Sequence, residues 1–399
     1  MGEPPRLTRL LLNLGHAIDH MFLLIFASAV GAIAAEFGFA RWEDLMPYGA
    51  GAFALFGIGS LPAGRLGDLW GRRRMMLVFF FGMGVSALAV AATRSAWQLA
   101  LALTLMGAFS AIYHPVGIPM LVRGSRRPGL TIGFNGLAGN LGVALAAFVT
   151  GFLVKYAGWR MAFVVPAFLA FACGLAFARA APAEGVAPAR RPVTHAMLPK
   201  GALAHVFAVV TVASISGSML YNLTTNGNGE LLRERLRGIV DDPAALGMLL
   251  ALVYVAGALA QVAVGSLLDR VPVKRLYAAI VALQLPLFLF AAGASGWALY
   301  ALMIAFMIAV FGAIPFTDAL IVRYVDDSMR SRVSGMRLAV AFGVSSLAVW
   351  ALGPLVKAAG FRWLLLLMAG VALVTFGVVM LLPRSRDAGL GGQRRPELG

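Results

Sequence analysis

The segment Gly64-Arg65-Leu66-Gly67-Asp68-Leu69-Trp70-Gly71-Arg72-Arg73-Arg74 stands between two long apolar runs, residues 45–66 and 75–93. It contains four arginines, whereas the run that follows it has no charged residue. An apolar stretch of about 20 residues can cross the roughly 30 Å core of a bilayer as a helix. The segment therefore predicts two membrane helices joined by a short basic loop.

The same alternation of apolar runs and short polar loops continues along the 399 residues, of which 60% are hydrophobic and 13% charged. Soluble domains carry roughly 25% charged residues, and barrel strands would alternate over about 10 residues. We therefore predict an all-α membrane protein with twelve transmembrane helices in two pseudo-symmetric six-helix bundles. The expected helices are residues 8–35, 45–66, 75–93, 97–122, 130–156, 159–181, 201–226, 245–268, 274–293, 297–324, 331–357 and 361–383.

Residues 182–200 are rich in Pro and Arg and predict a linker. The expected organisation is an N-terminal bundle (1–181), this linker, a C-terminal bundle (201–383) and a tail (384–399). If both termini and the linker lie on one side, that side holds 24 of the 33 Lys and Arg residues. Basic loops mark the cytoplasmic side, so both termini, the linker and the tail are expected there. The formal charge of +16 then reflects membrane orientation, and nucleic-acid binding is not expected.

The two halves repeat each other. Residues 133–160 align without gaps on 335–362, and the shared ending is Lys155, Ala157, Gly158 and Arg160 against Lys357, Ala359, Gly360 and Arg362. A second echo pairs Gly64 and Asp68 with Gly265 and Asp269. In both repeats, the corresponding residues of the two halves are expected on the same side of the membrane. This predicts parallel halves related by an axis along the membrane normal.

The basic loop closely resembles the signature loop between helices two and three of the major facilitator superfamily. This resemblance, with the linker and the repeat, covers nearly the whole chain. It implies a transporter whose cytoplasmic face is locked by a charge cluster, because Asp68 lies beside a helix end and near basic side chains. The residues assigned to this gate are Gly64, Asp68, Gly71, Arg72, Arg73 and, from the echo, Asp269. The alternative is a basic anchor alone.

Within that superfamily, Tyr113-His114-Pro115 resembles the Phe-His-Pro of the fosmidomycin-resistance efflux group. Gly139-Asn140-x-Gly142 and the His16 and Asp19 pair resemble that group too. The chain departs from drug antiporters, since Val149-Thr150-Gly151 replaces their Gly-Pro pair and the fourth helix has no arginine at membrane depth. Drug export and the direction of transport are therefore left open.

Ionisable residues at bilayer depth are costly and usually functional. In the first helix, Asn13, His16, Asp19 and His20 form one polar stripe, and the fourth helix offers Tyr113 and His114. We predict proton coupling by Asp19, His16, His20 and His114. The superfamily resemblance places the seventh and tenth helices at the cavity as well. The predicted substrate-binding residues are Asn13, Tyr113, His114, Tyr221, Asn222, Thr317 and Asp318.

The resulting hypothesis is a secondary transporter that works by alternating access and exports a small molecule as a proton-coupled antiporter. It is expected to be a monomer in lipid, in the bacterial inner membrane, with no catalytic activity, no cofactor and no resident metal. No G-x-x-x-x-G-K-[ST] motif for ATP occurs in the chain. Two alternatives stay open: a transporter of a transition metal or metal chelate, since His and Asp are suitable ligands, and a membrane-embedded enzyme that uses His16 or His114 as a base.

Overall fold

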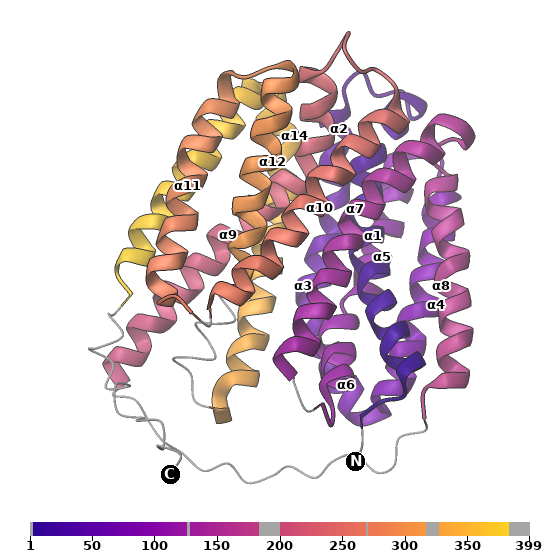
Figure 1. The fold of residues 1–399 in the computed structure, drawn as a ribbon. Helices are drawn as coiled ribbons and strands as arrows, with labels where there is room; N and C mark the ends of the chain where they lie inside the picture. The colour runs from indigo at the N-terminus through magenta and orange to yellow at the C-terminus, as the bar shows by residue number, and fades with distance from the viewer. Residues whose placement is uncertain (1–2, 126–127, 183–199, 269, 317–326, 383–399) are drawn as a thin grey trace.

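The computed structural model describes residues 3–125, 128–182, 200–268, 270–316 and 327–382, and every regular element in these ranges is a helix (Figure 1). The elements are α1 (Arg6–Glu36), α2 (Trp42–Leu45), η1 (Met46–Gly49), α3 (Ala50–Trp70), α4 (Arg72–Ala91), α5 (Ala96–Ser110), η2 (Tyr113–Gly117), α6 (Ile118–Val122), α7 (Pro128–Ala157), α8 (Met161–Ala180), α9 (Lys200–Arg235), α10 (Pro243–Leu268), α11 (Val273–Gly293), α12 (Gly296–Gly312) and α14 (Asp327–Met380). The all-helical prediction is confirmed.

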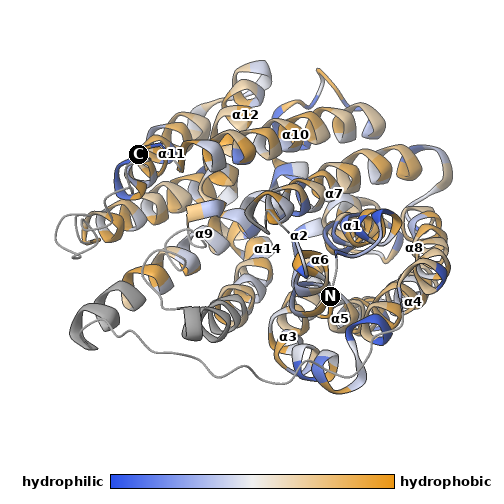
Figure 2. Cartoon of the chain, turned by 60° about the horizontal axis from the view of Figure 1, so that its bottom comes forward, coloured by the Kyte–Doolittle hydropathy of each residue, from blue (hydrophilic) through white to orange (hydrophobic). Residues whose placement is uncertain are grey.

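Ten helical segments of the described chain are long and apolar enough to cross a membrane. Large apolar side chains such as Leu101, Phe290 and Leu347 are exposed on their outer surfaces. Hydrophobic residues cover the lengths of the helices, and hydrophilic ones gather near their ends (Figure 2). Such a surface suits lipid, and the chain is an integral membrane protein. The number of twelve spans stays a prediction.

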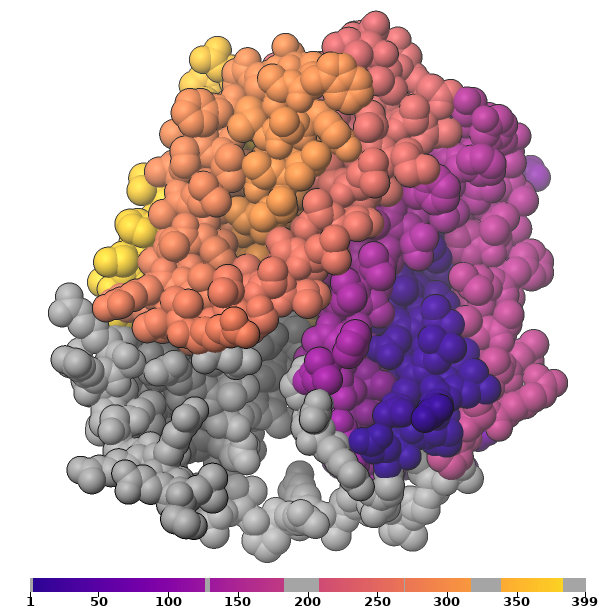
Figure 3. All heavy atoms as spheres, in the orientation of Figure 1, coloured from indigo at the N-terminus to yellow at the C-terminus, as the bar shows by residue number. Residues whose placement is uncertain are grey.

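The helices form an N-terminal group, α1 to α8, and a C-terminal group, α9 to α14, which meet where α7 packs against α10 and α3 against α14 (Figure 1). The first of these two contacts is visible at the surface in Figure 3. Equivalent hydrogen bonds tie the ends of each group. Arg73 Nε donates to the Ala181 carbonyl at 2.9 Å, and Lys274 Nζ donates to the Leu382 carbonyl at 2.5 Å. The repeat of the sequence is thus visible in the structure. The face that carries Ala181, where the linker begins, is called the linker face below.

The two groups are closer together at the opposite face. There, a Cβ built on Gly151 of α7 would lie 2.9 Å from the Gly247 Cα of α10. Towards the linker face, a Cβ on Gly133 of α7 or on Gly265 of α10 would meet no described atom of another element within 4 Å. The two helices therefore approach backbone to backbone near this face, and further along them the Asn140 amide of α7 donates a hydrogen bond to the side-chain oxygen of Gln261 on α10.

Several helix boundaries differ from the prediction; α12, for example, ends at Gly312 within the expected helix 297–324. The expected helix 97–122 is broken into α5, the π-helical η2 and α6, because Pro115 has no N–H to continue the α-helical ladder. The helix expected to end at residue 226 continues to Arg235 as α9. Its Asn-Gly pairs suggest a turn, but Asn226 donates back to the Asn222 carbonyl at 3.0 Å within the helix. The expected helices 331–357 and 361–383 are joined in α14, which bends at Gly360 with a φ of 78°.

Candidate functional site

A buried carboxylate on α1 marks the candidate site. Asp19 is completely buried in the apolar N-terminal group, and His16 is 5% exposed on the same helix. Asn13 and His20 are half-buried. The stripe predicted for the first helix is therefore directed into the protein.

Asp19 contacts two residues that follow each other closely in the chain. The Ser110 hydroxyl, at the end of α5, donates a short hydrogen bond to Oδ1 of Asp19. The His114 Nε2 lies 3.6 Å from the other oxygen, Oδ2, which has no hydrogen-bond partner in the described structure. An ionised carboxylate would be costly in such a place unless a protonated His114 faced it. Asp19 and His114 therefore suit each other as a pair whose charge changes together.

The π-helical segment η2 places His114 beside Asp19. One extra residue per turn rotates the side chains that follow, and π-turns are frequent at functional sites. Tyr113, in the same segment, is fully buried and stacks on the His16 ring with centroids 4.8 Å apart. The sequence predicted Tyr113 and His114 as site residues but not the π-turn that presents them.

Asn135 of α7 joins these side chains and was not among the predicted site residues. Its amide donates to the Asn13 Oδ1 at 2.9 Å and to the Tyr113 hydroxyl at 2.7 Å. Its backbone carbonyl lies 2.7 Å from the His16 Nδ1. Because a carbonyl can only accept, that nitrogen carries a proton. The available signal was that Asn135 is one of two asparagines, with Asn140, in an otherwise apolar stretch.

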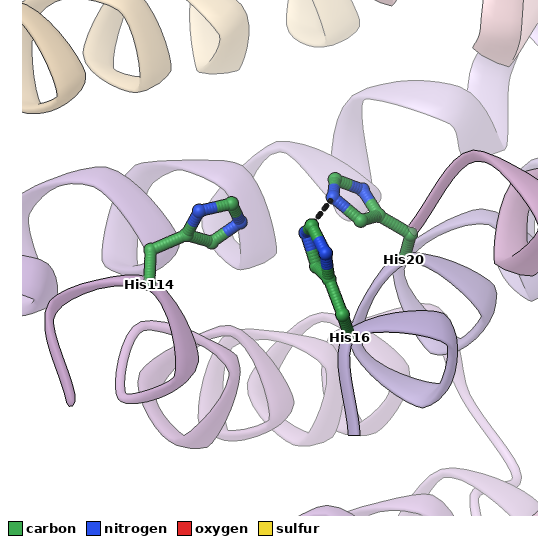
Figure 4. Close-up of side chains that lie close together, drawn as sticks. All are labelled: His16, His20 and His114. Carbon is green, nitrogen blue, oxygen red and sulfur yellow. Dashed lines mark hydrogen bonds between the residues drawn. The ribbon is translucent and has the colours of Figure 1, made fainter. Parts of the chain in front are cut away.

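Three imidazoles come together at this point (Figure 4). His16 Nε2 and His20 Nε2 are 3.1 Å apart and share a hydrogen bond, and His114 faces both rings from η2. One nitrogen from each of the three lies within 4.8 Å of the others. Zinc with bonds of about 2.0–2.1 Å would require nitrogens about 3.4 Å apart. The trio could hold a divalent ion after a small contraction.

The C-terminal group supplies a neutral polar cluster. Asn222 of α9 is buried and donates to the Ser345 hydroxyl of α14 at 2.8 Å. Ser218 bonds the same hydroxyl at 2.6 Å. Tyr221 contacts the Phe311 ring. The predicted residues Thr317 and Asp318 lie outside the described residues.

The predicted gate residues lie at the linker face, around the turn between α3 and α4. Gly71 joins the two helices with a φ of 93°, a conformation that favours glycine. Arg73 binds the carbonyls of Ala178 and Ala181, so it caps the end of α8. Asp68 is exposed and forms no ion pair with the residues that the structure describes, and Arg72 is half-buried. Asp269 lies outside those residues.

Comparisons with known proteins agree with this architecture. A bacterial homolog of the human lysosomal transporter Spinster, in an inward-facing and occupied conformation, superposes with a TM-score of 0.74 at 13% identity, over 97% of this chain and 98% of that one. Its inward-facing, unoccupied form gives a TM-score of 0.69 over 96% and 95%. At this identity the likeness concerns the fold alone.

A known relative and a family model both match the amino-acid sequence of the chain. The puromycin resistance protein pur8 of Streptomyces alboniger is 31% identical over 110 residues, and this match spans 27% of the chain and only 22% of that relative. The model described as Major Facilitator Superfamily matches residues 12–229, which is more than half of the chain. The chain therefore belongs to the Major Facilitator Superfamily.

Proposed function

We propose that this protein is a secondary active transporter that works by alternating access and exports a small molecule in exchange for protons. In this proposal twelve spans form two six-helix bundles around a central path. The protein lies in a bacterial inner membrane with both termini in the cytoplasm, and it acts as a monomer. The expected lack of catalytic activity belongs to the same proposal.

The observation that carries proton coupling is the position of Asp19. This carboxylate is fully buried and has one oxygen bound to Ser110 and the other free of a hydrogen bond within the described structure. A buried carboxyl group with one unsatisfied oxygen is well suited to gain and lose a proton. His114 faces that oxygen at 3.6 Å and offers a nearby group that could take up the charge.

The neighbouring histidines are placed so that they could pass protons to this site. The His16 Nδ1 proton is held by the Asn135 carbonyl, so its Nε2 is free to accept a proton from His20. Imidazoles bind and release protons near neutral pH and can pass them along a chain. A proton could therefore reach the Asp19 region through His20 and His16 while the substrate occupies the path.

Substrate contacts are proposed for Asn13, Tyr113, His114, Tyr221, Asn222, Thr317 and Asp318. The described part of this set offers amides, phenols and one imidazole, with no lysine or arginine. Such a site suits a neutral or cationic solute, which includes an aminonucleoside such as puromycin. The resemblance to the fosmidomycin-resistance group favours a phosphonate, which a protonated His114 could accommodate. These two compounds are the first probes.

The test uses purified protein in proteoliposomes with an imposed pH gradient and radiolabelled puromycin or fosmidomycin. A thermal-shift screen of antibiotics, metabolites and divalent metals selects other probes, since a ligand of the folded state raises its apparent stability. Asp19→Asn, which mimics a carboxyl that never loses its proton, should abolish accumulation driven by the gradient and spare exchange of solute for solute. Glu234→Gln, an exposed acid on α9, is the matched control. Gradient-driven accumulation that survives Asp19→Asn would refute proton coupling at this residue.

The close approach of the three imidazoles favours one second candidate, transport of a transition metal or its chelate. In this case His16→Ala, His20→Ala and His114→Ala should each weaken the binding of Co²⁺ or Zn²⁺ to the purified protein. Transport that ignores the pH gradient but stops with a chelator would favour this candidate over the first.

For the gate, Asp68→Asn should slow transport and leave probe binding intact, because Asp68 is exposed on the last turn of α3, whereas this helix contacts the His114 ring through Phe56. Arg65→Gln, an exposed charge of the same segment, is the comparison. Loss of probe binding in correctly folded Asp68→Asn would contradict the proposed gate.

A further inference from the structure

Two lysine–aspartate ion pairs join the two groups of helices at the face opposite the linker. Lys155, at the end of α7, binds Asp242, which directly precedes α10. Lys357 of α14 binds Asp44 of α2 at 2.5 Å. In each pair the lysine belongs to one group and the aspartate to the other. The two ion pairs therefore link the groups at two places. The lysine comes from the N-terminal group in one pair and from the C-terminal group in the other.

The two pairs occupy equivalent positions of the internal repeat. The sequence before each lysine is Gly151-Phe-Leu-Val-Lys155 in one group and Gly353-Pro-Leu-Val-Lys357 in the other. Lys155 and Lys357 are 202 residues apart, and Asp44 and Asp242 are 198 apart, which is nearly the same spacing. The arrangement is thus a duplicated structure with approximate two-fold symmetry.

The glycine of each segment meets the backbone next to the aspartate. A Cβ built on Gly151 would lie 2.5 Å from the Pro243 carbonyl oxygen, directly after Asp242. A Cβ on Gly353 would collide with the Glu43 carbonyl oxygen, directly before Asp44. Each lysine follows its glycine by four positions, so both lie on the same side of the helix. The glycine allows the close approach, and the lysine binds the charge one turn away.

The contacts are of a kind that can open and close. The four side chains are between 34% and 46% exposed, and exposed ion pairs are individually weak. Beside the second pair, Trp42 stacks on the buried Phe361 with ring centroids 6.0 Å apart, so apolar contacts accompany the ion pairs at this face. Further along the same two helices, towards the linker face, the described polar contact is the uncharged hydrogen bond from the Asn140 amide to the Gln261 oxygen.

We propose that the two Gly-x-Leu-Val-Lys segments, with Asp242 and Asp44, form a paired latch that closes the membrane face opposite the linker and must release on both sides for that face to open. The latch rests on the proposed alternating access, and it adds to it the residues that hold one of the two end states. Neither the signature loop nor the buried acid contributes to it.

The test measures distances between spin labels, which requires no substrate and no knowledge of orientation. Labels on Trp97→Cys and Trp297→Cys, at the exposed starts of α5 and α12, report on the latched face. Labels on Leu7→Cys and Leu267→Cys report on the linker face. Cys173→Ser removes the only native cysteine. The labelled protein is studied in lipid nanodiscs by pulsed electron paramagnetic resonance.

Lys155→Gln with Lys357→Gln should raise the ratio of long to short distances at the latched face roughly two- to fivefold for each pair lost, as expected for exposed ion pairs. The distances at the linker face should shorten. The control, Arg94→Gln with Arg362→Gln, removes two exposed positive charges that form no ion pair within the described residues, and it should change neither distribution. Reversal of one pair, Lys155→Asp with Asp242→Lys, should restore the closed distribution relative to Lys155→Asp alone.

Unchanged distances in the doubly substituted protein, an equal shift in the control, or no restoration on charge reversal would each overturn the latch. The Asp19→Asn transport experiment is independent of this result. If the label distances respond as expected but transport does not depend on the pH gradient, only proton coupling is refuted. Fixed distances in a protein that still transports would refute the latch only.

Discussion

Gly64 of α3 lies against Pro115 of η2: a Cβ built on the glycine would be 3.2 Å from the proline Cβ. Three residues further along α3, a Cβ on Gly67 would be 2.9 Å from a Val116 methyl group. Pro115 directly follows His114, which faces Asp19. The end of α3 that carries the basic loop therefore packs on the turn that positions the buried site, and neither can move far without the other.

This contact predicts that a larger side chain at position 64 impairs transport without entering the site. Gly64→Val should displace Pro115 and cost about 1–3 kcal/mol in strain, whereas Gly64→Ala should have a smaller effect of the same sign. The measurements are gradient-driven uptake of the chosen probe and the apparent melting temperature. Gly133→Ala, where a methyl group meets no described atom of another element, is the control. Equal activity of Gly64→Val and the control would refute the coupling.

Ser110→Ala removes the hydroxyl that binds Asp19 and leaves the carboxylate without its one close donor. We expect proton-driven transport to fall more than solute exchange does, because only the driven cycle requires both protonation states of Asp19. The control is Ser86→Ala, since Ser86 is equally buried but binds only the Met83 carbonyl of its own helix. A parallel loss of both activities would indicate that Ser110 acts only in folding.

Asn135→Ala leaves Asn13 and Tyr113 without their shared donor. An unsatisfied buried polar group costs about 1–3 kcal/mol, so the apparent melting temperature in detergent should fall clearly. Thr375→Val serves as the comparison, because the Thr375 hydroxyl binds only the Val371 carbonyl one turn earlier in its own helix. If Asn135→Ala melts like Thr375→Val, the side-chain network does not stabilise the N-terminal group.

The closed latch should weaken in acid. The hydrogen bond from Lys155, followed by one from the Ala245 N–H, holds the pKa of Asp242 below its ordinary value. A carboxyl group whose pKa is lowered in the closed form stabilises that form at pH values above the ordinary carboxyl pKa of about 4. This stabilisation is lost as the pH falls through the lowered pKa. The distance between labels at positions 97 and 297 should therefore lengthen below about pH 4.

The matching variant, Asp242→Asn, should already show the longer distances at pH 7 and change less on acidification. Asp241→Asn is the control, because Asp241 accepts from the Gly238 N–H and does not bind a lysine. Other titrating groups near Lys155, including Tyr156, are present in every variant and cancel in the comparison. Identical acid responses in the native protein and Asp242→Asn would remove Asp242 from the latch.

Orientation is tested through the linker. With 24 of the 33 basic residues assigned to its side, Arg190→Cys should resist a membrane-impermeant maleimide added to intact cells and react after the cells are opened. A cysteine at the exposed Trp97, on the opposite face, is the positive control. Rapid reaction at position 190 in intact cells would reverse the proposed topology.

The fold was accessible from sequence because its main signal, apolar runs of membrane length, depends on composition alone. The α1 stripe was also accessible, since a helix repeats every 3.6 residues and places His16, Asp19 and His20 on adjoining faces. The position of Asn135 was not, because its importance arises from contacts with residues more than 20 positions away. The latch could be identified only from the sequence and the structure together. The sequence repeat drew attention to Lys155 and Lys357, but only the structure shows that each lysine binds an aspartate of the other group of helices.

The predicted helix boundaries were wrong where a tertiary contact, or a missing backbone N–H donor, outweighs the local conformational preference of the residues. The α9 helix continues through Asn226 and Asn228 because the residues that follow are packed, with Glu230 only 6% exposed beside α1. The break at Pro115 follows from the absence of an N–H. The sequence analysis predicted one continuous helix there, because the π-helical geometry depends on how Tyr113 and Ser110 pack against α1.

The neutral cluster of Asn222, Ser218 and Ser345 has a consequence for how this protein can diversify. Each group of helices repeats the other's architecture, yet the described carboxyl and imidazole groups of the site all lie in the first one. Changes among the amide and hydroxyl groups of the second would alter which solute fits while the proton-handling residues stay intact. A chimaera that keeps residues 1–181 and takes its remaining helices from a relative should therefore acquire that relative's cargo and retain its own energy source.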